Sequence, residues 1–292
     1  MAVYERRYGP YLGTKTARNQ RFMVLPAYSY QELFKSKLFI VFLAIWGVYS
    51  LLVLSILLYL PHNAAVLKAL SILPTEIIES LKFDASFFFS WFMVPSMIVS
   101  YLTALVIGPA LISADLRNNG LPLYLARPFG RWEYVLGKSA SMLILLSFVT
   151  WIPGVFLFAL QSYLSGWDWF KANASIGPAI FLTSAIWIVL LSMTSLAISA
   201  YVKWKPVARL CLILVFIIMP TIGNLVNFLI KTSWGSVLDI RRMTAVIATT
   251  MFKIPNQSNV STLVAWLSIL GFSAFCIVLL SRKVRAYEVI KS

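Results

Sequence analysis

Residues 38–60 read LFIVFLAIWGVYSLLVLSILLYL, a run without a single charged side chain. At about 1.5 Å per residue, a helix of this length exceeds the roughly 30 Å thickness of a bilayer's hydrocarbon core. Further apolar runs lie near residues 88–112, 136–162, 178–202, 206–230 and 262–281. The sequence therefore predicts an all-α integral membrane protein with six transmembrane helices.

The composition of the 292-residue chain excludes an ordinary soluble protein. It is 60% hydrophobic and 12% charged, with a mean hydropathy of +0.83. The net charge of +15 does not indicate nucleic-acid binding, because the Lys and Arg residues stand next to the apolar runs. With the N-terminus inside, 18 of the 25 Lys and Arg residues fall on the inner side. We expect a multi-pass protein of a bacterial inner (cytoplasmic) membrane with both termini in the cytoplasm.

The polar segments around the spans have their own patterns. Residues 1–37 are basic, and 27–37 predict an amphipathic helix on the inner interface, with Tyr30 and Leu33 on its apolar face and Glu32 and Lys35 turned away. The transmembrane domain occupies 38–281, and 282–292 form a cytoplasmic tail. The outer loop 231–261 has an apolar helical face, which fits short helices dipping into the outer leaflet or an ordinary ordered loop.

A compact polar island separates the second and third spans. It begins at Asp115-Leu116-Arg117-Asn118-Asn119-Gly120 and contains a short apolar turn, Leu121-Pro122-Leu123-Tyr124-Leu125. Arg127-Pro128 ends that turn, and Arg131-Trp132-Glu133 leads to Gly137-Lys138. A solvated loop has no need of these apolar side chains. They indicate either a contact for another protein or packing on the chain's own helices or on lipid.

The chain shows no catalytic, cofactor-binding or metal-binding set. Gly137-Lys138-Ser139 resembles the end of a phosphate-binding loop, but the pattern requires Gly where Trp132 stands, so we do not expect ATP binding by this chain. None of the ten acidic residues lies deep inside a span, and Asp239 falls in an outer loop. Ion pumps and proton-coupled carriers usually need ionisable groups within the membrane. The sequence therefore argues against ion coupling.

The island and the six-span layout resemble ABC-2 type transporter permeases (type V exporter-like). The likeness rests on Leu111-Ile112-Ser113-Ala114-Asp115, on residues 120–128, and on Arg131 to Lys138. In that family an acidic residue ends span two, a short helix and a small-Pro turn follow, and Gly-Lys enters span three. This chain has Asp115 where Glu is usual, and Leu121-Pro122 where Thr-Leu is usual.

The resemblance implies a coupling helix at about 115–127 that docks on a separate ABC ATPase subunit, with the 27–37 helix beside it. ATP and Mg would belong to that subunit, and two permease chains would pair as a homo- or heterodimer within membrane lipid. The implied contact residues are Asp115, Arg117, Leu121, Leu123, Tyr124, Leu125, Arg127, Arg131, Glu32 and Lys35.

The expected function is therefore a non-catalytic transport subunit that exports a hydrophobic or amphipathic substrate. The alternatives are a non-transporting membrane anchor or assembly partner of an ATPase, and a stand-alone secondary transporter. Asn224 and Asn227, on adjacent turns of span five, are candidates for the substrate pathway. They could equally form hydrogen bonds between helices.

Overall fold

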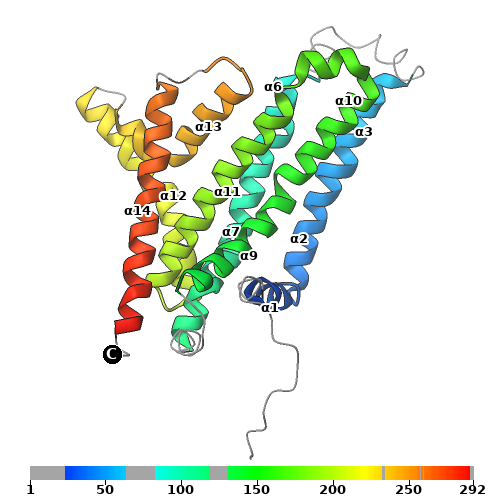
Figure 1. Ribbon diagram of the computed structural model, residues 1–292. Coiled ribbons are helices and arrows are strands. Elements are labelled where there is room, and N and C mark those ends of the chain that lie inside the picture. Colours follow the sequence, from blue (N-terminus) through cyan, green and yellow to red (C-terminus); the bar gives the residue numbers. More distant parts are fainter. Residues whose placement is uncertain are drawn as a thin grey trace, which may run out of the picture.

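The fold is a bundle of long helices (Figure 1). The structure is a computed structural model that describes residues 24–63, 83–118, 131–231, 234–256, 258 and 260–289. All secondary-structure elements in these ranges are helical, which confirms the all-α prediction for the described part. Six helical segments there are long and apolar enough to cross a membrane. This is the architecture of a multi-pass membrane protein.

The six segments overlap the six expected spans. The first, Lys37–His62, consists of α2 Lys37–Gly47, η2 Val48–Val53, α3 Leu54–Tyr59 and η3 Leu60–His62, and the second, Ala85–Arg117, of α6 Ala85–Phe87, η4 Phe88–Met93 and α7 Val94–Arg117. The third, Glu133–Asn173, lies in α9 Arg131–Val149 and α10 Trp151–Asn173. The last three are α11 Ile176–Tyr201, α12 Lys205–Ile230, and Thr262–Lys283 within α14 Thr262–Val289. The third is the longest and contains a break at Gly166, whose φ of +83° suits a residue without Cβ.

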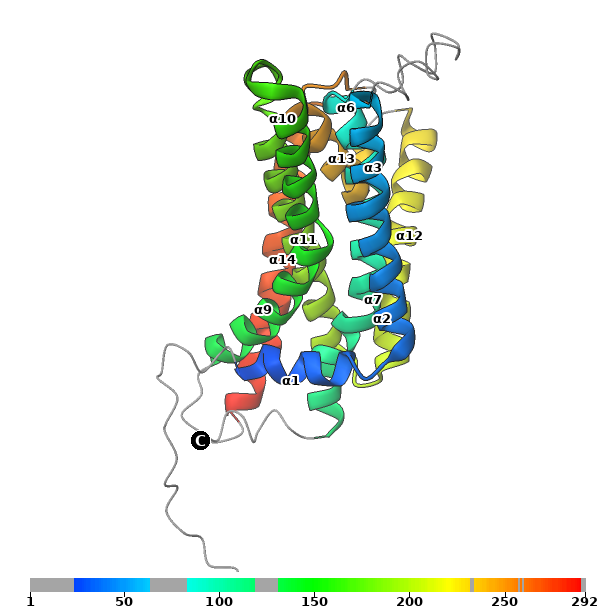
Figure 2. The same cartoon turned by 90° about the vertical axis from the view of Figure 1, so that its right-hand side faces the viewer.

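Helix α1, Val24–Leu33, lies across one end of the bundle, at a steep angle to the long helices (Figure 2). We call this end the α1 end and the opposite one the α6 end. The helix begins and ends earlier than the expected 27–37. It cannot continue to residue 37 because Ser36 caps the next helix, where its hydroxyl accepts the Phe39 N–H at 3.4 Å. Leu38 therefore belongs to α2, where its side chain is exposed.

Helices α7 and α11 form the centre of the bundle and are the most buried of the spans. Small hydroxyl side chains allow their backbones to approach closely. Ser199 Oγ accepts the Ile112 N–H at 3.1 Å, and the Ser113 hydroxyl donates to the Ser199 carbonyl at 3.2 Å. These contacts fix α11 against the α1 end of α7.

Prolines inside the spans create bonds between helices. A proline has no N–H to donate to the carbonyl four residues before it, so that carbonyl needs another donor. Pro95 leaves the Trp91 carbonyl without a donor, and the Tyr49 hydroxyl donates to it at 2.7 Å. In the same way Trp46 Nε1 donates to the Val149 carbonyl, freed by Pro153, at 2.8 Å. Arg209 Nε donates to the Leu105 carbonyl, freed by Pro109, at 3.0 Å. Each donor belongs to another span than its acceptor, so these bonds connect spans that are separate in the sequence.

The loop after α12 returns into the bundle. Lys231 adopts a left-handed backbone conformation that reverses the chain, and the short helix η5, Trp234–Leu238, then runs back along α12. The backbones of Gly223 and Gly235 are in contact. A Cβ on either residue would therefore meet the carbonyl oxygen of the other. Asn227 Oδ1 accepts the Gly235 N–H at 2.7 Å and its amide donates to the Ser236 hydroxyl at 3.0 Å.

Helix α13, Ile240–Met251, then runs back toward the α6 end (Figure 1). Its first residues pack against Phe216 and Pro220 of α12. These stand 14 and 10 residues before Ile230, which is about 21 and 15 Å from the end of α12 at 1.5 Å per residue. Residues 234–251 therefore form a hairpin that folds back along α12 into the bundle, and we call it the re-entrant hairpin. That it dips into the outer leaflet stays a prediction.

Candidate functional site

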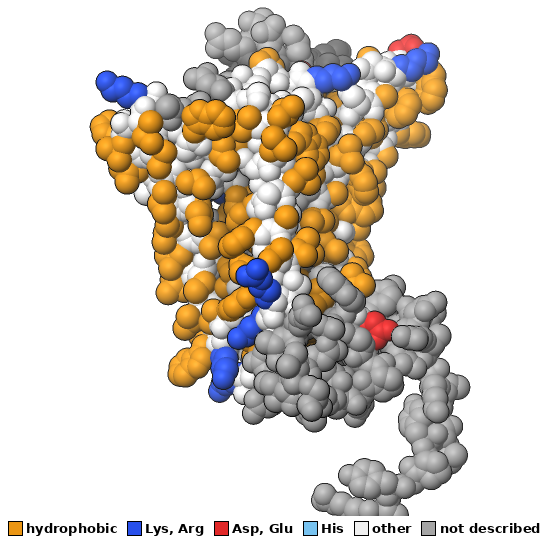
Figure 3. All heavy atoms as spheres, turned by 60° about the vertical axis from the view of Figure 1, so that its left-hand side comes forward, with side chains coloured by type: hydrophobic (Ala, Val, Ile, Leu, Met, Phe, Trp, Pro, Cys, Tyr) orange, Lys and Arg blue, Asp and Glu red, His pale blue; other side chains and the backbone are white. Residues whose placement is uncertain are grey.

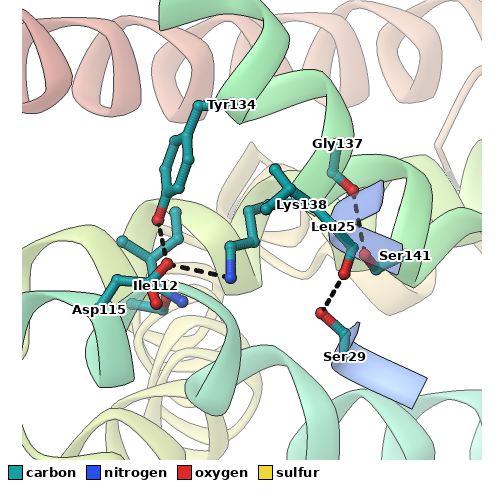
Figure 4. Close-up of polar contacts among 9 residues, drawn as sticks. Leu25, Ser29, Ile112, Asp115, Tyr134, Gly137, Lys138 and Ser141 are labelled. Atoms are coloured by element: carbon teal, nitrogen blue, oxygen red, sulfur yellow. Dashed lines mark hydrogen bonds and ion pairs between the residues drawn. The ribbon is translucent and has the colours of Figure 1, made fainter. Parts of the chain in front are cut away.

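The expected coupling segment is flanked by a buried polar cluster at the α1 end (Figure 4). Asp115 lies in the last turn of α7, while Tyr134 and Lys138 lie about one turn apart near the start of α9. Lys138 Nζ stands 3.0 Å from Asp115 Oδ2, and the Tyr134 hydroxyl donates to the same oxygen at 2.7 Å. The side chains of Lys138 and Asp115 are only 9% and 15% exposed.

This cluster, which we call the Asp115 clamp, joins the two helices on either side of residues 119–130. The Lys138 ammonium also lies 5.7 Å from the centre of the Tyr134 ring, so the three groups form one compact unit. Because the pair is shielded from water, its mutual attraction is much stronger than that of a surface pair. The ends of α7 and α9 are therefore held in a defined relative position.

Helix α1 is tied to the same α9. The Tyr30 hydroxyl donates to the Ser141 carbonyl at 2.7 Å, one turn beyond Lys138. Leu25 is buried, and Tyr30 and Leu33 pack against the same apolar core as α7 and α9. Phe34, just after the helix, is about half exposed. Any displacement of α1 would therefore act directly on the helix that carries Lys138.

Burial raises the pKa of Tyr30 to about 12. Below pH 10 the phenol is neutral whether or not α1 is docked. Between about pH 10 and 12 the undocked phenol ionises first, so the docked state loses stability as the pH rises.

We expect Tyr30→Phe to lower the unfolding free energy in detergent by roughly 1 kcal/mol at neutral pH, through the lost hydrogen bond. The difference in unfolding free energy between the wild type and Tyr30→Phe should shrink from pH 10 to 12. A constant difference from pH 9 to 12 would contradict a buried, hydrogen-bonded Tyr30 phenol.

The other expected contact residues are only partly placed. Arg117 and Lys35 are exposed at the α1 end, where a partner could reach them. Glu32 lies in α1 and Arg131 begins α9, but their side chains are outside the described set. The predicted contacts in the connecting turn also fall outside the described residues, namely Leu121, Leu123, Tyr124, Leu125 and Arg127.

The Gly137-Lys138-Ser139 triplet lies inside α9 with no loop around it. Its lysine is engaged with Asp115, and the Ser141 hydroxyl donates to the Gly137 carbonyl at 3.0 Å. Sequence reasoning missed Tyr134 and Lys138 as partners of Asp115. The available signal was an acidic residue ending one span and a lysine beginning the next, at the same membrane face.

The two asparagines of span five differ in their surroundings. Asn227 holds η5 in place through both ends of its amide, as described above, so its observed role is structural. Asn224 is exposed on the bundle surface. The structure therefore does not bring the two together as one polar cluster, and their place on a substrate pathway stays a prediction.

A groove of about 530 Å³ opens between α7 and α12. Trp187 of α11 and the start of α13 complete its walls. Its lining is apolar and aromatic apart from Arg241; the lining residues are Phe89, Val94, Met97, Ile98, Tyr101, Leu105, Trp187, Ile213, Phe216, Ile217, Arg241 and Ala245. Arg209 reaches the α1 end of the groove through its bond to the Leu105 carbonyl.

The groove bears on one expectation from the sequence. Asp239, expected in an outer loop, connects η5 to α13, caps α13 and packs with Arg241 against the middle of α12 rather than beyond its end. Tyr101, near the middle of the Ala85–Arg117 span, lines the groove beside Arg241. Asp239 and Arg241 therefore lie halfway along the bundle. An absence of charged groups at this depth can no longer be used against ion coupling.

No protein-family model matches this chain, and no curated protein matches it either. The geometry of the clamp, the re-entrant hairpin and the groove therefore carries the functional argument. Among the side chains of the described ranges, no three His, Cys, Asp or Glu residues gather as they would around a metal ion.

Proposed function

We propose that this chain is the permease subunit of an ATP-driven ABC exporter of the ABC-2 type, which moves a hydrophobic or amphipathic substrate. A separate ATPase subunit would hydrolyse ATP, and a second permease chain would complete the pathway. The Asp115 clamp is the observation that carries this proposal. It joins the helices that flank residues 119–130, so a force on that segment would pass into the bundle's centre through α7 and into α1 through α9.

The wider layout supports the same proposal. A helix lies across the α1 end, six spans follow, and a re-entrant hairpin precedes the last span (Figure 1). Lysine and arginine side chains gather at the two ends of an apolar surface (Figure 3). Lys203, Lys205 and Arg282 lie at the α1 end with α1 itself, which favours a cytoplasmic α1 end facing the ATPase.

Replacing Leu123 and Tyr124 together with Asp is expected to abolish association with the ATPase, because two charges would then face an apolar docking contact. The measurement is affinity purification of the tagged chain from native membranes, followed by quantification of a co-purifying ATPase with a nucleotide-binding loop. A matched control places two acids at the opposite end, Tyr163→Asp with Trp167→Asp, where both side chains are exposed. The proposal fails if the ATPase is recovered equally with both double variants.

A stand-alone ion-coupled transporter is the second candidate, and the mid-depth Asp239 and Arg241 favour it. Such groups are costly in a membrane and are retained mostly for function. Substrate movement in proteoliposomes driven by an ion gradient alone, without ATP or a second subunit, would select this candidate. A non-transporting anchor or assembly partner would bind the ATPase but show no substrate-stimulated hydrolysis.

A further inference from the structure

The groove between α7 and α12 places a cation where a membrane protein usually avoids one. Arg241 lies in the first turn of α13, at the tip of the re-entrant hairpin and against the middle of α12. Its side chain is 57% exposed and lines the groove. A guanidinium at this depth needs a compensating anion, because burying an unpaired charge in an apolar medium is costly.

Asp239 compensates Arg241 only in part. Its Oδ1 already accepts the backbone N–H groups of Arg241 and Arg242, at 3.1 and 3.2 Å, as the cap of α13. Arg241 Nε stands 3.7 Å from the same oxygen, which is too long for a strong hydrogen bond. One carboxylate oxygen thus serves two backbone N–H groups as well as the Arg241 guanidinium, and the Arg241 side chain, 57% exposed, lines the groove.

The remaining walls of the groove suit a hydrocarbon chain. They are formed by aliphatic and aromatic side chains, and the Trp187 N–H is already used by Ser100 Oγ at 2.8 Å and by the Met97 carbonyl at 3.2 Å. A volume of about 530 Å³ is within the usual range of small-molecule sites, roughly 300–1,000 Å³. This size favours one hydrocarbon chain over a lipid with two.

We infer that the groove binds a single-chain amphiphile with an anionic head, the chain lying along α7 and α12 and the head on Arg241. Arg209, seven residues before Phe216 on α12 and so about 10 Å nearer the α1 end, offers a second cation along the same face. The two arginines define a path by which an anionic head could travel through the apolar layer. The binding site is argued from the groove itself; its use as a transport route rests on the proposed function.

The test is photo-cross-linking of the purified full-length chain in detergent. The probe is a monoalkyl phosphate with a 16-carbon, diazirine-bearing chain, compared with the alcohol of the same chain. We expect the phosphate to label residues of the groove at least ten times more efficiently than the alcohol. Arg241→Gln should remove this preference, and Arg241→Lys should retain part of it because the charge remains.

Two variants control for folding and for general charge. Arg242→Gln removes a neighbouring arginine that does not line the groove, so labelling should change less than twofold. Ala245→Phe fills the groove while keeping Arg241, so labelling by both probes should fall. If Arg241→Gln does not fold, the Arg241→Lys and Ala245→Phe results decide.

Three outcomes would overturn the inference. Equal labelling by phosphate and alcohol would show an apolar groove with no anion preference. Equal losses of phosphate labelling with Arg241→Gln and Arg242→Gln would show that the probe responds to the overall positive charge and not to contact with Arg241. A changed oligomeric state in place of labelling would show that a second copy covers the groove. None of these measurements requires the ATPase, so a failure here is distinguishable from a failure of ATPase association.

Discussion

Lys138→Ala is expected to destabilise the protein by about 3–5 kcal/mol, because it leaves the Asp115 carboxylate largely buried without its cation. The Tyr134 hydroxyl remains, but one hydrogen bond does not replace an ion pair in an environment that is mostly shielded from water. The measurement is the unfolding free energy in detergent, from titration with a denaturing detergent. The variant should also release α9 from α7 and so weaken ATPase association more than a distant change of equal stability cost.

The pair can be tested as a unit with a double-mutant cycle. Asp115→Leu with Lys138→Met removes both charges, so the double variant should be much more stable than the sum of the single losses implies. Lys171→Ala is the matched control, because it breaks the pair with Asp168, whose side chains are 60% and 102% exposed. It should change stability little. Additive single losses at Asp115 and Lys138 would show that the clamp is not a coupled pair.

The sequence predicted the helical class and the six spans because uninterrupted apolar runs have few physical alternatives in a membrane. It also predicted a helix before span one, whereas the predicted contact of Asp115 with an ATPase subunit stays a prediction. It could not supply the partners of Asp115, because Tyr134 and Lys138 meet it only once α7 and α9 pack side by side. The proline-freed carbonyls show the same limit: Pro153 announces a missing hydrogen bond, but not that Trp46 supplies it.

The depth of Asp239 and Arg241 was the main point that sequence reasoning missed. Hydropathy places a charged residue outside the membrane by default, and residues 231–242 are too polar and short to be read as a span. Irregular backbone is tolerated at depth only where it is buried in protein. The available signals were weak: Gly223 in span five, Gly235 twelve residues later, and an apolar helical face beginning at Ile240.

Gly223→Ala is expected to displace the re-entrant hairpin. An alanine Cβ at 223 would meet the carbonyl oxygen of Gly235, and neither atom belongs to a flexible side chain that could move aside. The backbone of η5 must therefore shift, which breaks the bonds of Asn227 to Gly235 and Ser236. Because η5 leads directly into Asp239, Arg241 should leave the groove, and labelling by the monoalkyl phosphate probe should fall by at least tenfold.

Hydrogen exchange measures the displacement itself. The amides of residues 235–243 should exchange at least ten times faster in Gly223→Ala, while those of α11 stay protected. Gly271→Ala in α14 is the matched control: it makes the same substitution inside a span, but its Cβ would point into open space. If Gly223→Ala leaves exchange and labelling unchanged, then the close contact of the two glycines does not hold the hairpin at depth. The position of Arg241 would then depend on the packing of α13 against α11, α12 and α14.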